Sequence, residues 1–194
     1  LDLSQALAQW VTPKEQIRKW VSLVNNVAQG EFPVKNRPLN LKVPNFEASM
    51  KDQAMYLSEK NFQRANQLIE AITTTDPDLL LRYYRSWHPL LEQAYGELGL
   101  GGSFNERLQE AMMRVIDVPI LEDHDVTLKQ PTVFYTFADP ALEKASDLEK
   151  FLWRMGPENA RQLQAYLAQW LVRLQAADIP EPRLQAPETN ASFE

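Results

Sequence analysis

The clearest pattern of apolar positions runs from Asp76 to Leu98. Its apolar residues are spaced by alternating fours and threes, which places them in one stripe along a helix. This stripe contains Leu80, Tyr84, Trp87, Leu91, Ala94 and Leu98, and it is flanked by Tyr83, Leu90 and Tyr95. The segment is the most aromatic and most persistently periodic one in the chain. It is therefore predicted to be the central helix of the core.

Pro89 falls inside this stripe and removes one backbone hydrogen bond of the helix. The apolar phase continues unchanged to Leu98, so the sequence predicts a kinked helix rather than a chain reversal. Helical spacing also predicts helices that begin at Leu3, Thr12, Ser58, Ser103, Ser146 and Pro157, with a short helical turn at Asp139. Three of these starts carry a capping box, in which a Ser or Thr precedes a Glu by three residues: Thr12 with Glu15, Ser103 with Glu106, and Ser146 with Glu149.

Extended structure is expected only in short pieces. Residues 46–57 contain β-compatible stretches around Lys51-Asp52-Gln53 and are predicted to form a short hairpin. Residues 132–137 alternate Val133, Tyr135 and Phe137 on one side, which is typical of a strand packed on helices. The fold class is thus mainly α, a single-domain bundle of about six to eight helices over residues 1–177 with minor β-structure. Residues 178–194 hold three prolines and few apolar residues, and are expected to be a disordered tail.

Composition narrows the function classes. A hydrophobic fraction of 44% and five tryptophans predict a real core. The net charge of −6 and the scattered basic residues argue against nucleic-acid binding, which needs clustered Lys and Arg. The absence of cysteine excludes disulfides, thiol catalysis and cysteine-ligated metals. The chain begins at Leu1 rather than Met, from which we expect a missing N-terminal part that could hold an anchor or a targeting signal.

Two loops superficially resemble ligand sites. Gly99-Leu100-Gly101-Gly102-Ser103 precedes a helix, as phosphate-binding loops do, but no strand precedes it and no Lys-Ser or Lys-Thr pair follows. We interpret it as a helix end, a turn and a Ser N-cap. The acidic loop from Glu122 to Asp125 surrounds His124, yet neighbouring loop residues seldom converge on one ion, and no H-E-x-x-H spacing exists. No metal and no cofactor is predicted.

The central helix carries the first group of candidate binding residues. Arg82 and Arg85 lie among aromatic residues and could bind an anionic or aromatic ligand through charge and cation–π contacts. They could equally pair with Glu92, Glu97 or acidic residues of neighbouring helices. His88 could act as a general base, but no nucleophile motif accompanies it, and a histidine that bonds backbone groups freed by Pro89 is the preferred interpretation.

The second group lies in Glu31–Pro44, a proline-rich connector that we call the strap. Lys35 and Arg37 could bind a ligand, since functional groups concentrate on loops held by rigid scaffolds. The alternative is a packing role, in which Phe32, Val34 and Leu39 anchor the strap on the helices. If a site exists, we expect it where the strap crosses the basic side of the central helix, near Arg82 and Arg85.

Several stretches together resemble one family. They are VNNVAQGEFPVKNRPLN (Val24–Asn40), YYRSWHPLLEQAYGELG, SFNERLQEAMMRVID, QPTVFYTFADPALE and FLWRMGPENA. They are similar, in the same order over about Thr12–Ala168, to a bacterial family classed as domain of unknown function 3014. The chain departs from the family pattern between Ser58 and Ile72, where a tyrosine-rich stretch is replaced by NFQRAN, which puts a shared role of that helix in doubt.

The resemblance implies an N-terminal transmembrane helix, a proline-rich linker and then this domain, on the periplasmic side of the inner membrane. It implies no activity or cofactor. The leading hypothesis is therefore a non-catalytic interaction or binding domain of a membrane-tethered envelope protein, whose partner is an unknown protein or envelope component. The alternatives are a hydrolase that acts on an envelope polymer through paired carboxylates, and a domain that binds a small anionic ligand.

Overall fold

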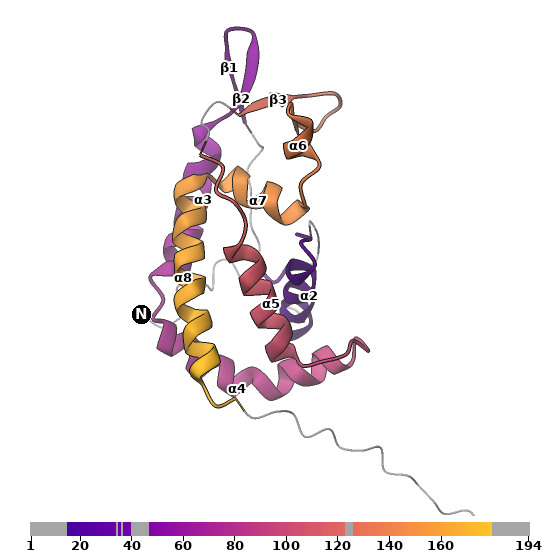
Figure 1. The fold of residues 1–194 in the computed structure, drawn as a ribbon, viewed down its shortest axis with the longest axis vertical. Helices are drawn as coiled ribbons and strands as arrows, with labels where there is room; N and C mark the ends of the chain where they lie inside the picture. Colours follow the sequence, from indigo (N-terminus) through magenta and orange to yellow (C-terminus); the bar gives the residue numbers. More distant parts are fainter. Residues whose placement is uncertain (1–14, 34, 36, 40–46, 123–125, 180–194) are drawn as a thin grey trace, which may run out of the picture.

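The computed structural model describes residues 15–33, 35, 37–39, 47–122 and 126–179. The helix expected at Leu3–Val11, the Thr12 cap and most of the C-terminal tail lie outside these residues. Seven helices are described, with a small antiparallel sheet at one end of an elongated molecule (Figure 1). The prediction of a mainly helical fold with minor β-structure is confirmed. None of the described helices is long and apolar enough to cross a membrane.

The helices form the lower and middle parts of the molecule in Figure 1. α2 (Gln16–Ala28), α5 (Phe104–Ile116) and α8 (Pro157–Ala176) pack around one core, α3 (Glu59–Thr73) lies along α8, and α4 (Pro77–Gly96) crosses the lower end. The short α6 (Pro140–Glu143) and α7 (Asp147–Met155) join this bundle to the sheet. The most deeply buried side chains come from several helices: Val21, Ile69, Leu148, Leu152 and Leu174.

The sheet has the order β1-β2-β3-β4, with every neighbouring pair antiparallel. β1 (Ala48–Lys51) and β2 (Ala54–Leu57) form the predicted hairpin, with β3 (Thr127–Lys129) and β4 (Thr136–Phe137) beside them. The strand expected at residues 132–137 is shorter than predicted. Val133 is almost fully exposed, and only Thr136 and Phe137 pair with β3, because the alternating pattern there belongs largely to a connection at the end of the sheet.

Most helix starts follow the predicted caps, but α2 does not: it begins at Gln16, and Glu15 is its N-cap with φ of +56° and no side-chain cap, so Glu15 does not take its place in the first turn of a helix started at Thr12. Ser103 and Ser146 form complete capping boxes with Glu106 and Glu149. Asp76 caps α4 through the backbone N–H of Asp78, and α4 continues without interruption through Pro89 to Gly96. The chain reversal that a proline could have caused is therefore absent from this helix, as the unbroken apolar phase predicted.

The core side of α4 differs from the predicted stripe. Tyr84, Leu91 and Ala94 are buried as expected, but Trp87 is 47% exposed. His88 and Glu92 are buried in place of an apolar residue. The helix is thus turned so that two polar side chains face the interior, which apolar periodicity could not indicate.

A glycine at the junction of α7 and α8 is required by its surroundings. Gly156 has φ of +92°, and a Cβ atom built on it would lie 2.5 Å from Cγ of Phe62 on α3. Such a distance is far inside van der Waals contact, and the backbone conformation is one that only glycine adopts without strain. Gly156 therefore lets α3 approach the helix junction closely.

We expect Gly156→Ala to lower the free energy of unfolding by about 2–5 kcal/mol, because the methyl group adds both overpacking and backbone strain. The matched control is Gly96→Ala at the end of α4, where a new Cβ meets nothing within 4 Å. Urea denaturation of both variants measures the difference. Equal stability of the two would contradict the close approach of α3.

Candidate functional site

The most unusual polar group in the structure is a buried carboxylate on α4. Both oxygens of Glu92 accept hydrogen bonds from the first turn of α5, from the N–H of Phe104 at 2.8 Å and from that of Asn105 at 3.1 Å. The first N–H groups of a helix have no partner within the helix and carry partial positive charge. Glu92 thus stabilises the start of α5 from a different helix.

The other N–H groups of this turn are also satisfied. Ser103 accepts from the N–H of Glu106 through its hydroxyl, at 3.1 Å, and from that of Arg107 through its carbonyl, also at 3.1 Å. Glu106 returns a bond to the N–H of Ser103 at 2.9 Å. A phosphate at this helix start would need these donors, and they are all engaged. The structure thereby supports the interpretation of the glycine-rich loop as a turn and a cap.

His88 lies one helical turn before Glu92 on the same buried side of α4. Its Nε2 atom is 3.0 Å from Oε1 of Glu92 without forming a hydrogen bond, so the two polar groups are close neighbours in the core. Tyr84 packs edge-on against the His88 ring at 5.5 Å and donates its hydroxyl to Oδ1 of Asn105 at 3.0 Å. Tyr84, His88, Glu92 and Asn105 form the group that we call the buried polar cluster.

The predicted binding residues are placed on different surfaces. His88 belongs to the buried polar cluster, where it faces Glu92 rather than solvent. Arg82 and Arg85 are exposed on the same helix. The suggested partners of these arginines pair elsewhere, since Glu92 contacts His88 and α5, and Glu97 contacts Arg18 of α2 at 3.1 Å. His88 and the two arginines therefore do not share one accessible site.

The strap packs against α7 and α2 in its described parts. Phe32 stacks on Phe151 of α7 with ring centroids 3.6 Å apart, and the Arg37 guanidinium lies 5.2 Å from the centre of the Phe32 ring. Pro38 is fully buried, and its carbonyl accepts from Gln16 at 3.4 Å, whereas Lys35 is exposed. These contacts support the packing role of the strap. A crossing over Arg82 and Arg85 remains a prediction.

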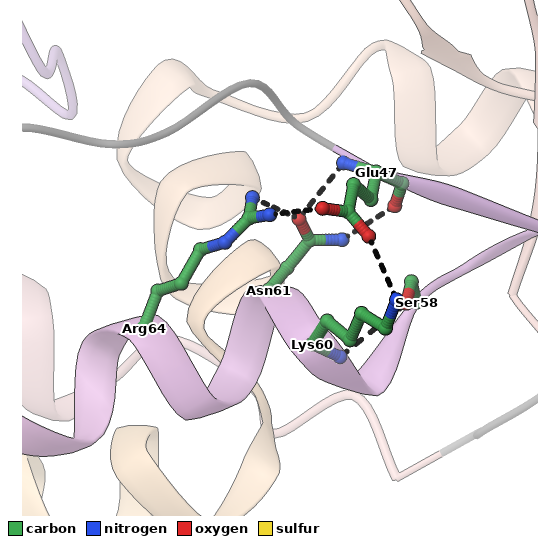
Figure 2. A network of polar contacts seen from close by, with 5 residues as sticks. All are labelled: Glu47, Ser58, Lys60, Asn61 and Arg64. Carbon is green, nitrogen blue, oxygen red and sulfur yellow. Dashed lines mark hydrogen bonds and ion pairs between the residues drawn. The ribbon is translucent and has the colours of Figure 1, made fainter.

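A second polar network joins α3 to the start of β1 (Figure 2). The Asn61 amide donates to the Glu47 carbonyl at 2.7 Å and accepts from the Glu47 N–H at 3.0 Å, so it pairs with the backbone as a neighbouring strand would. Arg64 and Lys60 both contact the Glu47 carboxylate, at 2.6 and 3.4 Å. The network joins Glu47, directly before β1, to α3 through backbone hydrogen bonds and ion pairs, and it thereby anchors the hairpin.

One open depression of about 520 Å³ lies beside the turn between α4 and α5. Tyr95, Leu100 and Met113 line its apolar part, and Arg107 and Glu110 are among its polar residues. Arg107 donates to Glu110 at 2.7 Å and to Asn25 at 3.0 Å, while the remaining acid, Glu106, belongs to the capping box. The charged side chains of the depression are thus held by neighbouring groups of the protein.

Metal binding receives no support in the described ranges, where His, Asp and Glu side chains nowhere gather in threes that could hold an ion. The acidic loop is only partly covered, since residues 123–125 lie outside the described residues. Its first member, Glu122, forms an ion pair with Arg161 of α8. The prediction concerning His124 therefore stays untested.

The buried polar cluster predicts a large effect of a small change. We expect Glu92→Gln to lower the free energy of unfolding by about 2–4 kcal/mol, because an amide places N–H groups against the donors of α5 and removes the charge next to His88. The control Glu97→Gln removes an exposed ion pair and should cost no more than about 0.5 kcal/mol. Urea denaturation at neutral pH compares them, and losses of similar size would contradict the capping role of Glu92.

The cluster also predicts an alkaline dependence of stability. Burial, and then the nearby Glu92 carboxylate, raise the pKa of Tyr84 well above its ordinary value of 10, and burial raises the pKa of Tyr166 to about 12. Above pH 10 the unfolded chain loses these protons while the folded protein keeps them. Stability must therefore fall as pH rises beyond 10.

Tyr84→Phe removes one of the protons that the unfolded chain releases. The slope of the unfolding free energy against pH should therefore become less steep by up to about 1.4 kcal/mol per pH unit. Denaturation curves between pH 9 and 11 give the slopes, and Tyr166→Phe provides a second variant that should change in the same direction. A slope that is unchanged in Tyr84→Phe would show that this hydroxyl titrates normally.

Comparison with known proteins gives one match. The model of a family described as a protein of unknown function, DUF3014, matches residues 16–170. No curated protein and no solved structure matches the sequence. The matched range includes all the helices described here except the end of α8. The chain therefore belongs to the DUF3014 family of proteins of unknown function, as the motifs of the strap and the central helix indicated.

Proposed function

We propose that this protein is a non-catalytic binding domain that holds a partner protein on the outer face of α4. By the outer face we mean the side chains of Tyr83, Trp87 and Leu90, which follow one another at helical spacing. Trp87 is 47% and Leu90 is 55% exposed, and Tyr83 is also exposed. This row of large apolar side chains on one helix is the observation that carries the proposal.

Several properties of this face favour a protein partner. Exposed apolar rows on a folded domain commonly mark interaction sites, and tryptophan, tyrosine and arginine are the residues that contribute most to binding at such sites. Arg82 and Arg85 are exposed on the same helix, and neither forms an ion pair within the described part of the chain. They do not belong to the outer face itself, since residues two positions apart on a helix point to different sides, but they are free to bind acidic groups of a partner that extends around α4. The face lies at the lower end of the molecule, where α4 crosses the bundle (Figure 1).

The rigidity of α4 supports this role. The buried polar cluster ties the inner side of the helix to α5, and Tyr84 packs edge-on against Trp170 of α8 at 5.9 Å. A helix held on its inner side presents its outer side chains with little loss of conformational freedom on binding. Hydrolysis through paired carboxylates is less well supported, because Glu92, Glu106 and Glu110 are all engaged by neighbouring groups.

Family resemblance extends the proposal to the cell. It suggests that the domain is held on the periplasmic side of the inner membrane by an N-terminal anchor, and that the partner is a protein of the envelope. In this arrangement α4 would present its outer face to proteins of the periplasm or of the membrane surface. A small anionic ligand at the arginines would be a narrower version of the same binding role.

The test compares the wild-type domain with a variant that carries Trp87→Ser and Leu90→Ser. Both side chains are exposed, so the variant should fold, which circular dichroism confirms. Immobilised wild type should retain a defined protein from an envelope extract, and affinity for that purified protein should fall at least tenfold in the variant. The matched control is Val133→Ser with Phe134→Ser, at the opposite end of the molecule. Equal affinities of wild type and the α4 variant would refute the proposal.

A further inference from the structure

Two chain connections lie at the same end of the sheet. β1 and β2 are joined by the turn at Asp52 and Gln53, and β3 and β4 are joined by residues 130–135. Because all neighbouring strands are antiparallel, both connections lie at the same end of the sheet. Figure 1 shows them at the upper end of the molecule, opposite to α4.

Large apolar side chains are exposed at this end. Val133 is 84% and Phe134 is 76% exposed, and Met50 of β1 is 67% exposed. Met50 pairs with Met55, Met55 with Leu128, and Leu128 with Phe137, so one row of side chains crosses the same face of the sheet. The row starts in the core at Phe137 and ends in solvent at Met50. Met50 is thus continuous with the hydrophobic interior through this row.

The connection that carries Val133 and Phe134 has a definite shape. The Phe134 N–H donates to the Thr132 hydroxyl at 3.3 Å, and the Phe137 N–H donates to the Glu143 carboxylate of α6 at 2.8 Å. One bond lies within the connection and the other holds β4 directly after it, and Val133 and Phe134 are exposed between β3 and β4. Apolar side chains in water are unfavourable, and transfer of Val133 and Phe134 into an apolar environment would lower the free energy.

Basic charge accompanies these side chains. Lys51 follows Met50 at the hairpin turn, and Lys129 ends β3 beside the other connection. Both are exposed, and within the described residues neither lysine forms an ion pair. Asp52 lies in the hairpin turn, and Asp139 and Glu143 follow β4, where Glu143 accepts the Phe137 N–H. Lys51 and Lys129 thus bring two exposed basic groups to this end of the sheet in a protein whose net charge is −6.

We propose that Met50, Val133 and Phe134, together with Lys51 and Lys129, form a contact site for an anionic lipid bilayer, which we call the sheet tip. The apolar side chains enter the boundary between headgroups and acyl chains, and the lysines bind lipid phosphates. A bilayer fits this geometry better than a protein does. The exposed side chains come from two separate parts of the chain, Met50 in β1 and Val133 and Phe134 in the connection to β4, and a lipid interface accepts such projections without shape complementarity.

The site is independent of the partner proposed for the outer face of α4. With the sheet tip on the membrane surface, α4 would lie at the end of the long axis away from the bilayer (Figure 1). Contact of this kind orients the domain and needs no membrane-spanning helix.

The chain contains no cysteine, so a single introduced cysteine can carry a polarity-sensitive fluorophore without background labelling. Val133→Cys and Met50→Cys place the label at the sheet tip, and Leu90→Cys places it on α4 as the control. Vesicles that contain phosphatidylglycerol should shift the emission of the first two labels to the blue and leave the third unchanged. No shift at Val133, or an equal shift at Leu90, would overturn the proposal.

A second measurement separates the two contributions to binding. In vesicle sedimentation, Val133→Ser with Phe134→Ser should lower the partition coefficient at least tenfold, since both apolar side chains that would leave water on binding are removed. Lys51→Gln with Lys129→Gln should lower it on phosphatidylglycerol vesicles but not on pure phosphatidylcholine. Labels at the sheet tip that respond to envelope proteins but not to protein-free vesicles would show a protein contact and refute the lipid site. Loss of partner binding in the α4 variant, measured without lipid, tests the other proposal separately.

Discussion

The arrangement of α4 and α5 depends on one buried carboxylate. Glu92 accepts two backbone N–H groups at the start of α5, at 2.8 and 3.1 Å, and lies 3.0 Å from His88. A charged group without partners would be very costly at this depth, and so would unsatisfied N–H groups. The hydrogen bonds between the Glu92 carboxylate and the N–H groups of α5 remove both costs. Because Glu92 must reach these N–H groups, the bonds determine how α4 crosses α5 and how α4 is rotated about its axis. The core then forms around that rotation, with Tyr84 between His88, Phe104 and Trp170.

The rotation has a direct consequence for the surface. If Trp87 were in the core, as its spacing suggests, Glu92 would turn away from α5. Because Glu92 faces inward, Trp87 and Leu90 are displaced towards solvent, where they form the outer face of α4 with Tyr83. The proposed binding surface is thus coupled to the capping of α5. A change that weakens the cap is expected to disturb the presentation of that surface as well.

The two proposed surfaces divide the molecule between its ends. The helical end carries apolar residues and arginines on one rigid helix, which suits a protein partner. The sheet end carries apolar residues and lysines on two turns, which suits a lipid surface. The Glu47–Asn61–Arg64 network anchors the hairpin to α3 (Figure 2), and the stacking of Phe32 on Phe151 holds the strap against α7. Both contacts stabilise the scaffold between the ends rather than forming sites themselves.

Features that depend on side chains within four positions of one another can be predicted from the sequence. They are the capping boxes at Ser103 and Ser146, the start of α4 at Asp76 and the hairpin turn near Asp52. Family membership was also readable, because it rests on motifs. The candidate site was only partly predictable, since Arg82 and Arg85 are exposed as a binding role needs, but His88 is not. The sequence indicates Glu92 only as a possible ion-pair partner of those arginines. Its partners in the structure are backbone N–H groups twelve and thirteen residues further along the chain. Every residue except proline has such a group, and it needs an acceptor from outside the helix only where a helix begins. Tertiary contacts therefore decide which side of α4 faces the core. Hydrophobic periodicity depends only on the positions of apolar side chains, and it contains no information on the backbone N–H groups that a buried carboxylate must bind.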